Sequence, residues 1–457
     1  MKDERHRRVE QLRSSLEGLA TKDIRAVALT VVDNAGITRV KTVPLERMAD
    51  AVAYGVGMSP VFDVFLVNDD ITTSKEIGGP DGDLRLVPDP ARLTPLAAQP
   101  GWAWAPADKL TQEGVPFAGC QRSFARRMVE RARDAGVELE TSFEVEWVLG
   151  RRDGVDMEPV ASGPAYGMEV LIRVSDFARD LIDALNEEGV AVQQFHPEYS
   201  PGQLEISLAP SDPVTAADVN VLVRQTIRAV ALRHGLAPSF APAVVAGQVG
   251  NGGHVHFSVW AEGSNLFAGG KGRYGLTEGG ESFLAGIVDA LPALTAVGAP
   301  SVASYTRLVP SHWAGAYACW GLENREAALR FIRGSAGIRD RRANAEVKCF
   351  DASANPYLVV GALIVAGLDG MERGLELPGE VTGDPALKPA EELRARGIAR
   401  LPESLGEALS HLEGWDLLRR ATGDALFHAF AAVRRAELDL FGESSPEAVV
   451  EATRWRY

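Results

Sequence analysis

The sequence predicts an α+β fold with a small N-terminal domain and a larger second domain. A length of 457 residues is more than one domain usually needs. Segments of strand and helix type follow one another in mixed rather than strictly alternating order, which favours α+β over a doubly wound α/β sheet. From Pro356 onward the pattern is helix-rich. We therefore expect one domain of residues 1–105 and a second of residues 106–457, with a helical C-terminal part.

The N-terminal domain begins with a charged amphipathic helix, predicted over residues 5–19. Two β-rich runs flank the Asp-Asn-Ala-Gly sequence of residues 33–36, a pattern typical of a β-hairpin. A proline at the start of the next segment suits the first turn of a helix. The predicted strands are 26–32, 38–43 and 84–87, and the predicted helix is 44–55.

The larger domain combines amphipathic helices with short, buried strands. Apolar spacing and glycines at segment ends mark the helices. Strands are predicted at 143–149, 204–208 and 253–260, and helices at 122–136, 175–189, 216–235, 356–368, 403–412 and 424–441.

Composition narrows the classes of function. The formal net charge of −15 disfavours a general binder of nucleic acid or of anionic membranes, although local arginines can still hold a small anion. The 3 cysteines have no paired-ligand spacing, which suits a reducing compartment without disulfides. The N-terminus lacks the apolar core of a signal peptide, and no run of about 18 apolar residues occurs. We expect a cytoplasmic protein without a membrane segment.

Polar residues spaced two apart mark strand-like segments, namely Glu144-Val145-Glu146, Gln203-Leu204-Glu205 and His254-Val255-His256. Alternate residues of a strand share one face, so each segment directs a polar pair to one side. Carboxylates with an imidazole form a hard donor set suited to Mg²⁺ or Mn²⁺. For one such pair alone, a solvent-exposed face is the commoner outcome. The apolar residues beside Glu146 and Glu205 favour burial instead, and buried carboxylates require a counter-charge.

Fixed positive charge follows later in the chain. Arg325 and Arg330 lie close together in the sequence, with Arg307 and Lys348 on either side. Such arginines are either ordinary surface residues or a clamp on a phosphoryl group, since guanidinium matches phosphate oxygens geometrically. The sequence has no P-loop, no GxSxG motif and no CxxC pair, which removes several other enzyme classes.

A longer ordered set of motifs runs through the chain: Glu144-x-Glu146, Glu198…Pro201-Gly202-Gln203-x-Glu205, Gly253-His254-Val255-His256-x-Ser258, Arg307-Leu308-Val309-Pro310, Asn324-Arg325…Arg330 and Glu346…Asn355-Pro356-Tyr357-Leu358. In this order the motifs resemble those of the glutamine synthetase family, and most of all its bacterial type I branch. The resemblance covers most of the chain, and the order of the motifs argues against coincidence.

The resemblance implies a β-grasp N-terminal domain, a larger catalytic domain and a homododecamer of two stacked hexameric rings. Active sites in the family lie between neighbouring subunits. It also implies an ATP-dependent ligase of nitrogen metabolism whose substrates are glutamate, ATP and an amine. ATP phosphorylates the side-chain carboxylate of glutamate, and the amine then attacks the acyl phosphate.

Matching motif positions imply the roles of individual residues. The implied ligands of one Mg²⁺ or Mn²⁺ ion are Glu146, Glu198 and Glu205, and those of a second ion are Glu144, His254 and Glu346. The residues expected near ATP are His256, Ser258 and Arg330. Those expected to hold glutamate are Asn251, Gly252, Arg307 and Lys348. Arg325 is expected to meet the phosphoryl group during transfer.

Two positions depart from the family where ammonia-using members bind ammonium. Val56 stands in place of an aspartate of the N-terminal domain, and Trp313 in place of an acid on the flap after Arg-Leu-Val-Pro. The loss of two anions weakens the binding of a small cation. Valine and indole instead offer apolar surface and a cation–π face to a larger amine. In the alternative, Glu323 or Glu326 supplies a nearby acid and restores the use of ammonia.

Two further positions depart from the family. Lys348 replaces an arginine that holds the substrate carboxylate in the family, and Asn344 replaces another arginine. A lysine keeps the charge but loses the bidentate fork. We expect weaker binding of glutamate as a result.

The sequence thus favours a ligase that joins glutamate to a small primary amine of the ethanolamine or alkylamine type, which gives a γ-glutamylamide. The nearest alternative uses a polyamine such as putrescine or spermidine, whose distal ammonium needs an acidic entrance, and Asp63, Asp69 or Asp70 could line it. Ordinary glutamine synthetase and a catalytically silent regulatory homologue remain as alternatives. A complete set of implied metal ligands argues against the silent homologue.

Overall fold

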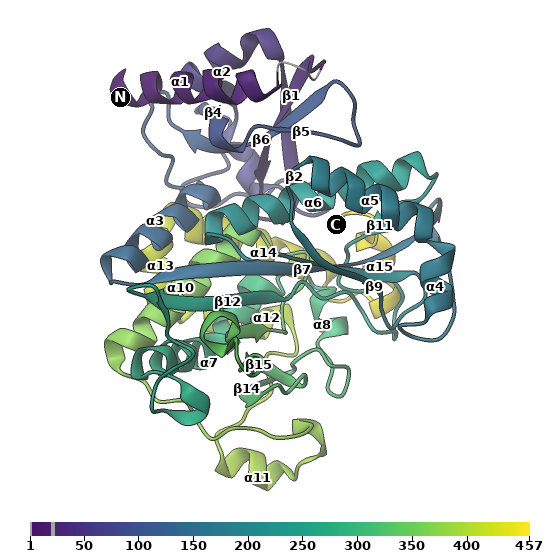
Figure 1. The fold of residues 1–457 in the computed structure, drawn as a ribbon, viewed down its shortest axis with the longest axis vertical. Coiled ribbons are helices and arrows are strands. Elements are labelled where there is room, and N and C mark those ends of the chain that lie inside the picture. The colour runs from purple at the N-terminus through teal and green to yellow at the C-terminus, as the bar shows by residue number, and fades with distance from the viewer. Residues whose placement is uncertain (1, 20–22) are drawn as a thin grey trace.

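The computed structural model describes residues 2–19 and 23–457. They form two sheets in different parts of the molecule, with helices around both (Figure 1). Figure 1 shows the N-terminal sheet at one end of the molecule and the long strand β7 (Glu138–Asp153) crossing the middle. This mixture of separate helical and strand layers confirms the predicted α+β class.

The N-terminal part is built on a 6-stranded sheet of order β2-β1-β6-β4-β3, in which β5 pairs with β6. β1 and β2 form the predicted antiparallel hairpin, whereas β6 joins β1 in parallel. The predicted helix over 44–55 starts later, at Met48, because residues 45–47 form a 3₁₀ turn. The elements are α1 (Lys2–Leu19), β1 (Ala26–Val32), β2 (Thr38–Pro44), α2 (Met48–Tyr54), β3 (Val56–Met58), β4 (Leu84–Pro88), β5 (Thr94–Pro95) and β6 (Trp102–Leu110).

The larger part is built on a 10-stranded sheet whose main path is β14-β15-β16-β12-β7-β10-β9. β7 extends the predicted strand 143–149 at both ends and pairs with β8, β10, β11 and β12. The other strands of this sheet are β8 (Asp156–Pro159), β9 (Val192–Pro197), β10 (Gln203–Leu208), β11 (Ala237–Ser239), β12 (Val255–Ala261), β13 (Ser264–Asn265), β14 (Tyr317–Leu322), β15 (Ala327–Ile332) and β16 (Asn344–Val347).

Helices supply most of the remaining core. α7 and α10 approach closely, since an added Cβ at Gly286 would lie 2.2 Å from the carbonyl oxygen of Ala366. Among the described helices, α7 alone has the length and apolar composition of a membrane span, and 78% of that stretch is buried inside the molecule. The helices of this part are α3 (Gln121–Asp134), α4 (Met168–Arg173), α5 (Ser175–Glu187), α6 (Pro213–Arg233), α7 (Glu278–Gly298), α8 (Ser304–Arg307), α9 (Arg339–Arg342), α10 (Pro356–Arg373), α11 (Ala390–Ala395), α12 (Leu405–Glu413), α13 (Asp416–Thr422), α14 (Asp424–Phe441) and α15 (Pro446–Thr453).

A buried polar junction joins the two parts of the molecule. The side chain of Asn355 caps α10 by accepting the N–H groups of Tyr357 and Leu358. Its amide donates to the carbonyl oxygens of Val32 and Asp33, at the turn of the N-terminal hairpin. One side chain therefore fixes both the start of a core helix and the position of the hairpin.

Replacing Asn355 with alanine should lower the free energy of unfolding by about 3 kcal/mol, because a helix cap and two hydrogen bonds to buried carbonyls are lost together. As a control, Ser404→Ala removes only an exposed cap on the N–H of Glu407 and should cost about 1 kcal/mol. Scanning calorimetry of both variants measures the difference. An equal decrease in the free energy of unfolding in both variants would contradict the role of Asn355 in joining the two parts.

Candidate active site

The register of the large sheet brings most of the predicted residues to one face. Direct cross-strand partners project to the same side of a sheet. The partners are Glu146–Glu205, Glu205–His196, His256–Glu346 and Arg330–Glu346. Alternation along β7 adds Glu144 to this face, and alternation from His256 back to the start of β12 adds His254. Segments far apart in the sequence thus build one acidic surface.

Glu144, His254 and Glu346 form the first group of close donor atoms. His254 Nδ1 lies 3.1 Å from Glu144 Oε2 and 3.3 Å from Glu346 Oε1. His254 and Glu346 are buried, and Glu144 is partly buried. One donor atom from each lies within 4.8 Å of the others, which is close enough for one metal ion. The structure therefore brings together the residues expected to share this ion.

The second set of expected ligands divides between two groups. Glu146 and Glu205 group with His254, whereas Glu198 groups with Glu205 and His196. His196 Nε2 lies 3.2 Å from Glu205 Oε1, and its Nδ1 lies 3.6 Å from Glu198 Oε1. His196 is absent from the predicted set, although it lies two residues before Glu198 and that spacing was a usable signal. Glu205 links the two groups.

Crowding of acids controls protonation on this face. Burial raises the pKa of Glu205 to about 7, aided by neighbouring carboxylates and opposed by the hydrogen bond with His196. Burial would lower the pKa of His256, but its hydrogen bond and charge interaction with Glu144, together with the charge of Glu346, raise that pKa to about 9. Protons or metal ions must balance this charge.

Fixed cations border the acidic groups. Arg330 donates to Glu346 Oε2 at 2.9 Å, and Lys348 Nζ lies 3.2 Å from Glu346 Oε1. Arg307 is buried, lies 3.3 Å from His254 Nε2, and donates to the carbonyl oxygen of Lys348 at 3.2 Å. Three of the predicted cations therefore stand beside the first donor group, where an anionic substrate would meet them.

The other residues expected near ATP lie along β12. His256 and Ser258 share its face by alternation. His256 Nδ1 lies 2.9 Å from Asn344 Oδ1, so the asparagine that replaces a family arginine contacts an expected ATP residue. Ser258 Oγ accepts the indole N–H of Trp260 at 2.8 Å.

The glycine-rich loop of residues 250–253, just before β12, contacts the acidic groups from one side. The Gly252 N–H donates to Glu146 Oε2 at 2.8 Å. The Asn251 side chain is fully buried, and its amide donates to the carbonyl oxygens of Ser239 and Ala241. Asn251 therefore shapes the loop, and its contact with glutamate stays a prediction.

Three predicted residues belong to none of the close donor groups that the described part of the chain forms. Val56 lies in β3, opposite Leu86 in the N-terminal sheet. Arg325 is exposed in the turn before β15, and no ion pair holds it among residues 2–19 and 23–457. Trp313 is 59% exposed, and its backbone N–H donates to Glu326 Oε1 at 2.9 Å. Their expected roles stay predictions.

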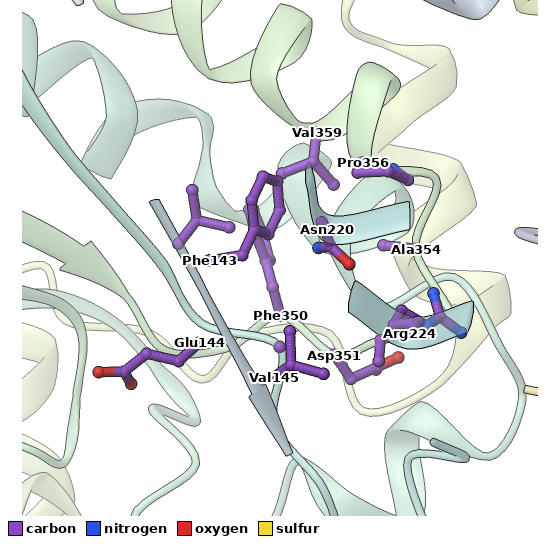
Figure 2. Close-up of a pocket in the computed structure, with 13 residues that line it drawn as sticks. Phe143, Glu144, Val145, Asn220, Arg224, Phe350, Asp351, Ala354, Pro356 and Val359 are labelled. Atoms are coloured by element: carbon purple, nitrogen blue, oxygen red, sulfur yellow. The ribbon is translucent and has the colours of Figure 1, made fainter. Parts of the chain in front are cut away.

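A small cavity lies beside β7, where residues 143–145 form part of its lining. Figure 2 shows the Glu144 carboxylate pointing away from Asn220, Arg224 and Asp351, which help to line this cavity. Within the described chain, Asn220 Oδ1, Arg224 Nε and Asp351 Oδ2 are buried without a hydrogen-bond partner. Glu144 lines this cavity, but its carboxylate points away from the other polar lining residues, so the cavity is not the catalytic cleft.

A sheet face lined by carboxylates and imidazoles, with arginine and lysine beside it, defines an enzyme that handles anionic substrates over divalent cations. The chain belongs to the glutamine synthetase family. A family model described as the glutamine synthetase catalytic domain matches residues 118–452, and one for the glutamine synthetase N-terminal domain matches residues 10–119. The chain is accordingly a glutamate–amine ligase that uses ATP and divalent metal ions.

Relatives match the chain over nearly its whole length. The γ-glutamylpolyamine synthetase GlnA3 of Streptomyces coelicolor is 53% identical over 442 residues, which cover 96% of this chain and 95% of the relative. A solved structure of a novel glutamine synthase homolog is 34% identical with a TM-score of 0.85, covering 95% of this chain and 99% of the other. A solved ADP complex of GmaS is 29% identical to this chain with a TM-score of 0.83, and the match covers 94% of this chain and 96% of the other. The family predicted from the motifs is confirmed.

Gly252→Ala should weaken the binding of Mn²⁺ by about tenfold, which is the lower range for changes next to metal ligands. An added Cβ would lie 2.4 Å from His254 Nε2 and 2.7 Å from Glu146 Oε1, so both donors must move. Isothermal titration with Mn²⁺ measures the affinity. Gly79→Ala is the matched control, since its Cβ would meet nothing within 4 Å. Unchanged affinity in Gly252→Ala would show that these donors do not hold the metal.

Metal binding should release protons between pH 6 and pH 8. The pKa of Glu205 is raised to about 7 without metal, so its carboxyl is largely protonated below that pH and must ionise to bind a cation. Affinity for Mg²⁺ should therefore fall as pH falls through about 7. Calorimetry in two buffers of different ionisation enthalpy counts the protons. Binding without proton release over this range would contradict the assignment.

Proposed function

We propose that the protein joins the γ-carboxylate of L-glutamate to a primary amine of a polyamine, with ATP cleaved to ADP and phosphate. The observation that carries the chemistry is the convergence of acidic and imidazole donors on one face of the sheet, bordered by Arg307, Arg330 and Lys348. The amine class is supported by the polyamine synthetase that is 53% identical to this chain.

The sequence alone favoured a small monoamine, and the relative favours the polyamine alternative instead. The same two substitutions support a monoamine and a polyamine as the acceptor. Val56 and Trp313 replace acids of ammonia-using members with apolar side chains, so the acceptor pocket suits an amine that has a carbon body. A polyamine meets this condition along its methylene chain, which makes it consistent with the substitutions as well as with the relative.

The donor sets fit divalent cations, because carboxylate oxygens with an imidazole are ligands that Mg²⁺ and Mn²⁺ accept. We propose that two ions per site are held, one by Glu146, Glu198 and Glu205 and the other by Glu144, His254 and Glu346. When bound, such ions screen the charges of the triphosphate and of the substrate carboxylate. His196 groups with Glu198 and Glu205 and would orient them.

The fixed cations then control the phosphoryl transfer. We propose that Arg307 and Lys348, with the backbone of Gly252, hold glutamate beside the first donor group. His256, Ser258 and Arg330 contact ATP, and Arg325 meets the phosphoryl group from its exposed turn. The γ-carboxylate attacks the terminal phosphorus, which gives γ-glutamyl phosphate and ADP. The neutral amine then attacks the carbonyl carbon, phosphate leaves, and the nitrogen loses a proton to give the γ-glutamylamide.

Assembly is part of this proposal. Val56 lies in the N-terminal sheet, while the donor groups lie on the large sheet of the same chain (Figure 1). In the family, active sites form between neighbouring subunits, so we propose that Val56 serves a neighbour's site in a homododecamer. An isolated subunit would then lack part of its acceptor pocket.

The candidate acids for a polyamine entrance differ in their surroundings. Asp63 is buried in an ion pair with Lys109 and faces no solvent. Asp69 is engaged by Arg39 and Arg456. Asp70 is exposed and accepts a hydrogen bond from Asn68. Asp63 is therefore excluded from such an entrance, and Asp69 already has its counter-charges.

A phosphate-release assay with glutamate, ATP and a panel of amines tests the proposal. The panel contains spermine, spermidine, putrescine, ethanolamine, methylamine and ammonium. We expect kcat/KM for at least one polyamine to exceed that for ammonium and for each monoamine by more than about tenfold, because only the polyamine uses the extended apolar pocket. Glu346→Gln should abolish turnover and serves as the control for contaminating activity.

Each other outcome of this assay contradicts the proposal in its own way. Ammonium as the best acceptor would make the protein an ordinary glutamine synthetase. Ethanolamine or methylamine as the best acceptor would return the assignment to a small monoamine. Metal-dependent ATP binding without turnover of any amine would indicate a catalytically silent homologue.

A further inference from the structure

A buried acid, Glu326, adjoins the loop of residues 311–315 that carries Trp313. Its Oε1 accepts the backbone N–H of Trp313 at 2.9 Å, and only 9% of the residue is exposed. Ser311 and Trp313 both have positive φ, at 60° and 57°. This backbone conformation is unfavourable for tryptophan, so the hydrogen bond to Glu326 helps to hold the loop.

Glu326 lies on the active-site side of the sheet. It immediately precedes β15, and alternate residues Glu326, Ala328 and Arg330 share one face. Arg330 on that face forms an ion pair with Glu346, a predicted metal ligand. The loop lies over the same face, because an added Cβ at Gly315 would lie 2.9 Å from Ala328 Cα and 3.2 Å from Lys348 Cβ. Glu326 therefore borders the place where Lys348 is proposed to hold glutamate.

The carboxylate of Glu326 forms no ion pair among the described residues, although the charge of Lys348 acts on it. Its Oε2 has no hydrogen-bond partner, and no lysine or arginine pairs with it, among residues 2–19 and 23–457. Asp384 lies on the other side of the loop, where its carboxylate accepts the Ser311 hydroxyl and adds negative charge. Burial and the charge of Asp384 raise the pKa of Glu326, against the hydrogen bond from Trp313 and the charge of Lys348. A cationic ligand beside Oε2 would add a close counter-charge.

We propose that Glu326 binds the ammonium form of the acceptor amine and, with the indole of Trp313, determines the specificity for cationic amines that have a carbon chain. This inference rests on the proposed function. The carboxylate of Glu326, just before β15, would restore the negative charge that the chain lacks at Val56 and at Trp313. A carboxylate in a half-desolvated pocket binds an ammonium group strongly, while an indole face can cover the methylene chain.

Glu326→Gln tests the inference, because the amide oxygen can still accept the Trp313 N–H while the charge is lost. We expect KM for spermidine and for ammonium to rise about tenfold or more, as a charge-assisted hydrogen bond is lost. KM for hydroxylamine, an amine nucleophile that is uncharged at neutral pH, should stay within about twofold, since an uncharged ligand gains no charge assistance. Glu326→Asp, which keeps the charge, should restore part of the affinity for spermidine.

Glu323→Gln is the matched control, since it makes the same change at an exposed position three residues earlier. Its kinetics should equal those of the unaltered protein with every amine. If KM rose equally for hydroxylamine, ammonium and spermidine in Glu326→Gln, the inference would be overturned, because Glu326 would then only support the loop. Unchanged KM for ammonium and spermidine would also overturn it.

Different measurements test the use of a polyamine and the role of Glu326. If the unaltered protein uses ammonium but no polyamine, the proposed function fails. The comparison of ammonium with hydroxylamine in Glu326→Gln still decides whether Glu326 binds the cation. If polyamines are used but Glu326→Gln binds them normally, only the inference about Glu326 fails.

Discussion

The large β-sheet gathers carboxylates on one face, and their mutual repulsion and burial determine which side chains must surround them. Carboxylates that are largely withdrawn from water cost several kcal/mol unless cations balance them. Here part of the balance comes from imidazoles and from arginine and lysine at the border, and protons or metal ions must balance the rest. The residues that share this constraint are Glu144, Glu146, Glu205, Glu346, His254, Arg307, Arg330 and Lys348.

The fold serves this constraint by supplying a rigid surface. β7 pairs with β10 on one side, which holds Glu144 and Glu146 opposite Ser207 and Glu205, and with β12 on the other, where Phe143 lies opposite Val255. Core side chains such as Phe143 and Val145 alternate with these acids and face the opposite side of the strand (Figure 2). The glycine loop then holds Glu146 by a backbone N–H. Close-packed helices and the Asn355 junction keep these strands in one geometry.

Local patterns made part of this site predictable. Residues two apart on a strand identified Glu144 with Glu146 and His254 with His256, and motif order supplied the family. The spacing of His196 to Glu198 was a local signal, but its contact with Glu205 was not predictable, because that contact arises from the pairing of β9 with β10, a register that no local pattern reveals. The same holds for Glu326, whose contact with Trp313 depends on the course of a loop. Helix positions followed apolar periodicity, whereas short strands such as β3 and β16 carry too few residues to show a period.

We propose that this acidic face holds a pair of divalent cations, and anomalous X-ray scattering from crystals grown with Mn²⁺ and ADP would locate them. We expect one anomalous peak among Glu144, His254 and Glu346 and a second among Glu146, Glu198 and Glu205. Peaks confined to other parts of the protein surface, or an acidic face without any peak at saturating Mn²⁺, would contradict it.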